Sequence, residues 1–126
     1  MQNAKIFLVE DSEDQRKNLR LALEHQRIGH KVVLEASTLD QALDLVRNGS
    51  LERIGVNVAI LDGSLDATRP GCSDGRAVAD AIREGELSVA IIARSAHDEL
   101  LANYGDFYLY KASSIDSLLA IIASLP

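Results

Sequence analysis

Short runs of apolar residues alternate along this chain with segments in which apolar residues recur at helical spacing. The first run has no polar alternation, which is typical of a strand buried on both faces. Strands that alternate with helical segments favour βαβ units and a parallel sheet. The predicted strands cover residues 6–9, 31–36, 56–61, 88–93 and 107–110.

Capping residues mark where several of the predicted helices begin. Ser12 and Thr38 are each followed three positions later by a glutamine, which is the pattern of a capping box. The helices are predicted to begin near Ser12, Thr38, Asp74, His97 and Ser114, and residues 97–103 have room for only about two turns. Five strands and five helices in strict alternation, with a short fourth helix, predict an α/β doubly wound sheet with right-handed crossovers.

The length and net charge of the chain limit the number of domains and the kinds of partner that we expect. The 126 residues fit one domain spanning 1–126 with its own core, and a net charge of −6 argues against a basic face for nucleic acid. The apolar runs are too short to cross a membrane, and the N-terminus lacks a signal-peptide pattern. The single cysteine fits a reducing compartment. We therefore expect a cytoplasmic protein with no nucleic-acid or membrane partner.

The cysteine and the histidines show no pattern of a site. Cys72 lies in a predicted polar loop without partner ligands, and His25, His30 and His97 lack metal-ligand spacing. We expect the histidines to be surface residues.

Chemically active residues follow four of the predicted strands. Glu10 and Asp11 follow the first, Asp62 the third, Ser95 the fourth and Lys111 the fifth. In an open parallel sheet, ligands bind beyond the carboxyl ends of the strands. We therefore expect three carboxylates, one hydroxyl and one ammonium to converge at one edge of the sheet.

That set of groups suits phosphoryl chemistry at a metal site. Three crowded carboxylates repel one another unless a cation neutralises them, and oxygen-only ligands favour hydrated Mg²⁺. A carboxylate can attack phosphorus and form an aspartyl phosphate, whose two negative charges Mg²⁺ and Lys111 can balance. Taken singly, each residue also has a plain explanation: an acid near a helix N-terminus, a turn serine or a solvated lysine.

The ordered set resembles the receiver domain of two-component response regulators, over essentially the whole chain and in the manner of a stand-alone chemotaxis regulator. The matching segments are Val9-Glu10-Asp11, Leu61-Asp62, Asp74-Gly75, Ser95-Ala96 and Tyr108-Leu109-Tyr110-Lys111. The resemblance implies a flavodoxin-like sheet with strand order 2-1-3-4-5.

The same resemblance implies roles for individual residues. Asp62 is the implied phospho-acceptor, and Mg²⁺ is held by Glu10, Asp11, Asp62 and the backbone carbonyl of Ser64. Ser95 and Lys111 bind phosphoryl oxygens, and Tyr108 is the switch aromatic. The implied partners are a sensor histidine kinase or phosphotransfer protein and a downstream protein target, while the chain itself promotes only its own phosphorylation and dephosphorylation.

The chain departs from the family at a loop beside the acceptor. Residues 63–73 are longer than the usual loop and contain Asp66, Arg69, Pro70 and Gly71. We expect this loop to affect shielding of Asp62, partner docking or hydrolysis. Asp66 is a weak rival acceptor because it does not lie at a strand end.

Two further departures lie near the last strand. Ser95 and Lys111 are 16 positions apart, shorter than usual by roughly one and a half helical turns. Ala112 follows Lys111 where the family usually has a proline, commonly in a cis bond. A non-proline cis bond costs about 3 kcal/mol, so a trans bond is open to this loop.

Two other functions stay open from the sequence. One is a receiver-like interaction module that does not use phosphorylation. The other is a flavodoxin-like or phosphatase-like enzyme, against which two observations weigh. The loop after the first strand, residues 10–14, is too acidic for flavin phosphate. Asp62-Gly63-Ser64 also lacks the second aspartate of a haloacid-dehalogenase-type phosphatase. Since the chain ends after the last predicted helix, we expect no output domain.

Overall fold

Five parallel strands form one sheet in the order β2-β1-β3-β4-β5, as the resemblance to receiver domains implies. This computed structural model describes residues 1–25, 27, 29–66, 68–69 and 71–126. The strands are β1 (Lys5–Val9), β2 (Lys31–Ala36), β3 (Val58–Asp62), β4 (Ala90–Ser95) and β5 (Phe107–Tyr110). The helices found in that part of the chain are α1 (Glu13–Glu24), α2 (Leu39–Arg47), α3 (Ser50–Ile54), α4 (Ser73–Glu84) and α5 (Ile115–Ser124). The fold is flavodoxin-like.

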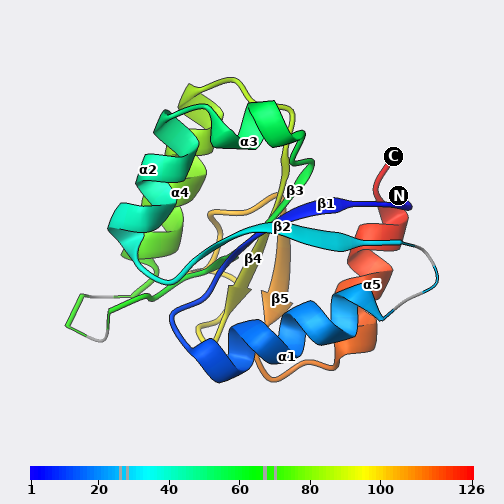
Figure 1. Cartoon of the computed structure of the whole chain (residues 1–126). Helices are drawn as coiled ribbons and strands as arrows, with labels where there is room; N and C mark the ends of the chain where they lie inside the picture. Colours follow the sequence, from blue (N-terminus) through cyan, green and yellow to red (C-terminus); the bar gives the residue numbers. More distant parts are fainter. Residues whose placement is uncertain (26, 28, 67, 70) are drawn as a thin grey trace.

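Helices cover both faces of the sheet. Helices α1 and α5 pack on one face, and α2, α3 and α4 lie on the other (Figure 1). Neighbouring residues of a strand point to opposite faces, so Leu8 packs with α1 and α5 while Phe7 packs with α2 and α4. Strands β1 and β3 are therefore buried on both faces, which explains their unbroken apolar runs.

The predicted caps form at three helix starts. Ser12 accepts a hydrogen bond from the Gln15 amide at 3.3 Å, and Thr38 accepts one from the Gln41 amide at 3.2 Å. Ser114 caps α5 in the same way. These caps fix where α1, α2 and α5 begin.

The prediction of a short helix over residues 97–103 is wrong. The described residues there form turns, and the additional short helix, α3, lies instead between α2 and β3. A helix is absent there because the chain turns inward at Tyr104, which is buried and donates a hydrogen bond to the Leu61 carbonyl at 2.8 Å. Gly105 lies so close to β4 that an added Cβ would be 2.7 Å from the Ala93 nitrogen. The segment between β4 and β5 therefore packs against the sheet at residues 104 and 105, and too few residues remain before them for a helix.

His30, predicted to be at the surface, and Cys72, predicted to lie in a polar loop, are both buried. Cys72 is buried at the start of α4, with its Sγ 3.5 Å from Ser95 Oγ. His30 is 1% exposed, and its Nδ1 accepts the Ala4 backbone N–H at 3.1 Å. Its Nε2 finds no partner among the described residues. Neither residue belongs to a periodic segment, so the sequence pattern carried no sign of its burial.

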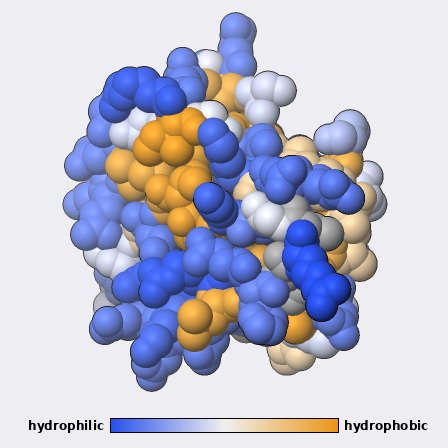
Figure 2. All heavy atoms as spheres, turned by 45° about the vertical axis from the view of Figure 1, so that its right-hand side comes forward, coloured by the Kyte–Doolittle hydropathy of each residue, from blue (hydrophilic) through white to orange (hydrophobic). Residues whose placement is uncertain are grey.

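The outer surface is mostly hydrophilic on the face seen in Figure 2, and hydrophobic side chains are confined to separate patches there. In the described part of the chain, no helix combines the length and apolar character needed to cross a membrane.

The buried histidine makes stability depend on pH. Burial lowers the pKa of His30 below 6.5, so the unfolded chain takes up a proton at this position before the folded chain does. The contribution of His30 to the free energy of unfolding should therefore fall as the pH drops below about 6.5. His30→Asn keeps an acceptor for the Ala4 amide and removes the titration. Other groups titrate in the same range, so the two proteins are compared: the free energy of unfolding of His30→Asn, measured in urea, should rise relative to the wild type's between about pH 7.5 and pH 5. A difference between the two proteins that does not change with pH would contradict this assignment.

Candidate functional site

Three carboxylates meet where β1 and β3 end. Glu10 follows β1, Asp62 ends β3, and the pairing of Val9 with Leu61 places the two acids side by side. Glu10, Asp11 and Asp62 offer oxygen atoms that lie within 4.8 Å of one another. Glu10 and Asp62 are buried, whereas Asp11 is exposed. The predicted convergence of these acids is confirmed.

Lys111 reaches into the same cluster from the end of β5. Its Nζ lies 3.0 Å from Asp62 Oδ2 and 3.4 Å from Glu10 Oε1. Its backbone N–H donates to the Ser95 carbonyl at 2.8 Å, which continues the pairing of β4 with β5. The bond to Ala112 is trans. The predicted ammonium thus contacts the acids directly, and it does so without the family's cis bond.

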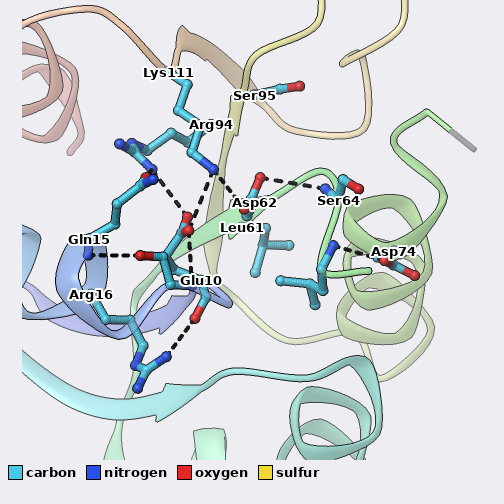
Figure 3. Close-up of polar contacts among 12 residues, drawn as sticks. Glu10, Gln15, Arg16, Leu61, Asp62, Ser64, Asp74, Arg94, Ser95 and Lys111 are labelled. Carbon is cyan, nitrogen blue, oxygen red and sulfur yellow. Dashed lines mark hydrogen bonds and ion pairs between the residues drawn. The ribbon is translucent and has the colours of Figure 1, made fainter. Parts of the chain in front are cut away.

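Sequence reasoning missed a second cation, Arg94. Its NH1 donates to Glu10 Oε2 at 3.2 Å and to Gln15 Oε1 at 3.3 Å (Figure 3). Arg94 directly follows the predicted strand 88–93, and in the structure it is the last but one residue of β4. A signal was present in the sequence: an arginine that adjoins the apolar run of an inner strand needs a partner if its side chain is buried.

Crowding raises the pKa of one carboxylate. Burial and the neighbouring Asp62 carboxylate raise the pKa of Glu10 from 4.5 to about 7, and Lys111 and the Ser12 amide only partly oppose this. The positively charged and hydrogen-bonding groups around Glu10 therefore do not fully offset the cost of its negative charge.

Ser95 does not contact the acids in this state. Its side chain points away from Asp62 (Figure 3), and its Oγ accepts the His97 N–H at 3.0 Å. Tyr108 is half-buried and donates its O–H to the His97 carbonyl at 2.7 Å. The hydroxyls of Ser95 and Tyr108 thus share His97 as a partner, and no hydrogen bond from Ser95 to Asp62 occurs among the described residues.

The segment after β3 bonds both to Asp62 and to the start of α4. The Ser64 amide donates to Asp62 Oδ1 at 3.4 Å. Asp74, buried at the start of α4, accepts the Leu65 amide at 2.8 Å and the Arg69 Nε at 2.6 Å. These bonds tie the described part of the long loop to α4.

Asp66 is engaged elsewhere. It accepts hydrogen bonds from the amide and hydroxyl of Thr68 at 2.9 and 2.7 Å. These bonds lower its pKa, and it is not part of the acidic cluster. Pro70, which the sequence places in this loop, lies outside the described residues.

Tyr104 packs against the backbone next to Asp62. Its ring lies against Gly75, where an added Cβ would come within 2.7 Å of Tyr104 Cζ and 2.8 Å of the Asp62 carbonyl oxygen. Burial raises the pKa of the Tyr104 phenol, so it remains a donor to the Leu61 carbonyl. The Asp74-Gly75 pair therefore serves packing at this point, with glycine required by the close approach.

The donor set fits a divalent cation with oxygen ligands. Three carboxylates gather with no histidine or cysteine ligand in the group, and hard ions such as Mg²⁺ prefer such oxygen donors. The raised pKa of Glu10 shows that positive charge would be stabilising there.

Glycine 75 can be tested by substitution. Gly75→Ala places a methyl group against backbone and a buried ring, and such overpacking typically costs about 1–3 kcal/mol. We expect the free energy of unfolding to fall by that amount in urea denaturation. Gly85→Ala is the matched control, because its Cβ meets nothing closer than 3.5 Å. A Gly75→Ala variant as stable as the control would refute the packing role.

Glu10 makes the metal-free protein less stable at higher pH. Its folded-state pKa is raised, so between about pH 4.5 and 7 the unfolded chain loses this proton first and the fold loses stability as the pH rises. The shift corresponds to a loss on the order of 3 kcal/mol. Glu10→Gln should lack this loss when unfolding is followed in EDTA, whereas Glu13→Gln, at the exposed start of α1, should keep it. If Glu10→Gln loses as much as the wild type, the buried charge does not cause the effect.

Known proteins resemble this chain in structure. No protein-family profile and no curated protein sequence matches it. A two-component response regulator of the LuxR family from an Aurantimonas species is 26% identical, with a TM-score of 0.77 and coverage of 98% of this chain and 84% of its own. A CheY-like response regulator receiver domain protein from Methanospirillum hungatei is 21% identical, with a TM-score of 0.73 and coverage of 95% and 90%.

A third similar structure is the phosphorylated cyanobacterial phytochrome response regulator RcpA. It is 24% identical, with a TM-score of 0.70 and coverage of 95% of this chain and 89% of its own. These matches span nearly the whole chain. It therefore has the fold of a receiver domain of the two-component response regulator family.

Proposed function

We propose that this chain is a cytoplasmic phospho-acceptor receiver domain, in which Asp62 accepts a phosphoryl group from a histidine kinase or a phosphotransfer protein. The observation that carries the proposal is the position of Lys111, 3.0 Å from a buried Asp62 that shares its edge with two more carboxylates. Isolated buried charges are costly. A cluster of three acids with a lysine aimed at one of them is therefore better explained by a bound ligand than by stability.

The residues can be given roles. Glu10, Asp11, Asp62 and the carbonyl of Ser64 would hold Mg²⁺, which supplies positive charge against the phosphoryl oxygens. An Asp62 carboxylate oxygen attacks phosphorus; the O–P bond forms, the P–N bond to the donor imidazole breaks, and the imidazole leaves. Lys111, already beside Asp62, pairs with a phosphoryl oxygen.

The switch residues start from a state that phosphorylation can change. An aspartyl phosphate needs a hydrogen-bond donor, and the Ser95 hydroxyl at the end of β4 is the candidate. To reach the phosphate it must release the His97 amide, the residue that also accepts from Tyr108. We infer that phosphorylation shifts the 96–108 segment between two existing arrangements. A downstream protein reads the change.

A second function has one observation in its favour. Ser95 faces away from the acids and bonds to His97, as expected for a receiver-like interaction module that never carries phosphate. In that case, the acids would serve only to hold Lys111 and Arg94 in place.

Phosphorylation separates the two functions. Incubation with acetyl phosphate and Mg²⁺ should add one phosphoryl group by intact-protein mass spectrometry, and EDTA should prevent the addition. Asp62→Asn should abolish it because the nucleophilic oxygen is lost. Asp66→Asn should leave it intact, since that carboxylate is bonded to Thr68. Uptake that persists in Asp62→Asn would refute the acceptor, and no uptake by the wild type would favour the interaction module.

A further inference from the structure

Arg94 places a permanent charge against the acidic cluster. Its side chain is 12% exposed and that of Glu10 is 1% exposed, and 3.2 Å separates Arg94 NH1 from Glu10 Oε2. The same NH1 donates to Gln15 Oε1 at 3.3 Å, which fixes the guanidinium between α1 and β4. An arginine does not lose its charge at any physiological pH, so this pair is permanent in the metal-free protein.

Both oxygens of Glu10 are occupied by protein donors. Oε1 receives the Ser12 amide at 3.3 Å and lies 3.4 Å from Lys111 Nζ, and Oε2 receives Arg94 (Figure 3). Asp11 is exposed and remains open to solvent. The oxygens of Asp62 also receive donors, from the Ser64 amide and Lys111, but among the three carboxylates the arginine pair is made by Glu10.

A divalent cation at this edge of the sheet would compete with Arg94 for the Glu10 carboxylate. It must share or displace the guanidinium at Glu10, and it is also repelled by a fixed like charge in a partly buried place, where screening is weak. Lys111 adds to the repulsion, but its flexible stem lets the ammonium move. Arg94 is less free, because Gln15 holds it.

We propose that Arg94 is an internal counter-ion of Glu10, which competes with the divalent cation and keeps the affinity of the site for Mg²⁺ low. Arg94 acts through Glu10 and is therefore a positioning residue. The inference rests on the divalent-cation site of the proposed function and not on phosphoryl transfer.

Mg²⁺ titration by calorimetry tests the competition, with no phosphodonor present. Arg94→Met keeps the aliphatic stem and frees Glu10 Oε2, so we expect its Kd for Mg²⁺ to fall by about tenfold or more, as for loss of one charge–charge contact. Arg16→Met is the matched control. Its NH1 donates to the Glu10 backbone carbonyl at 2.9 Å, and its Nε pairs with Glu35. The control removes one positive charge without freeing the Glu10 carboxylate, and its Kd should stay within about twofold of the wild type's.

A double-mutant cycle distinguishes the proposed competition from misfolding and from a general effect of charge on Mg²⁺ binding. Glu10→Gln with Arg94→Met removes both members of the buried pair, which leaves no unpaired charge. In the Glu10→Gln background, Arg94→Met should no longer tighten Mg²⁺ binding. An unchanged or higher Kd in Arg94→Met overturns the proposal, as does equal tightening in Arg16→Met or in the Glu10→Gln background.

The outcome is separable from that of the proposed function. Absence of Mg²⁺ binding in all these proteins, together with no uptake from acetyl phosphate, overturns both. Phosphoryl uptake on Asp62 combined with an Arg94→Met Kd equal to the wild type's overturns the counter-ion role alone.

Discussion

Repulsion among three carboxylates at the carboxyl edge of the sheet is the interaction on which the rest of this site depends. Adjacent β1 and β3 end together and force Glu10 and Asp62 into contact distance. Burial strengthens the repulsion and raises the pKa of Glu10 to about 7. Lys111 and Arg94 are best understood as responses to it, since each places a cation on an acid that the sheet order leaves too close to another.

The fold holds this edge in place from below. Tyr104 donates to the Leu61 carbonyl and packs on Gly75. The last residues of β3 are therefore in contact with both the β4–β5 connection and α4. That connection also carries His97, the shared partner of the Ser95 and Tyr108 hydroxyls. A change of charge at Asp62 therefore acts on a segment that touches both the strand beneath the acceptor and the proposed switch. A local electrostatic event and a surface rearrangement are linked through one connection.

Periodicity and strand-end chemistry predicted the sheet, its layers and the meeting of Glu10, Asp11, Asp62 and Lys111, because parallel strands bring their carboxyl ends to one edge. What the sequence did not reveal depends on single side chains whose direction has no period. Tyr104 is buried where a helix was expected nearby, and Arg94 directs its guanidinium at the Glu10 carboxylate. His30 and Cys72 gave no sign of their burial for the same reason.

The charges also suggest why the site has a resting form. Without a metal, Lys111 pairs with Asp62, Arg94 pairs with Glu10, and Ser95 bonds away from both acids. Under the proposed function, each of these contacts would have to loosen for a cation and a phosphoryl group to be held, so all three would stabilise the unphosphorylated arrangement. A ligand shifts such an equilibrium only by the difference in its affinity for the two states. The internal cations would then set how much affinity the metal and the phosphoryl group must supply before the 96–108 segment moves.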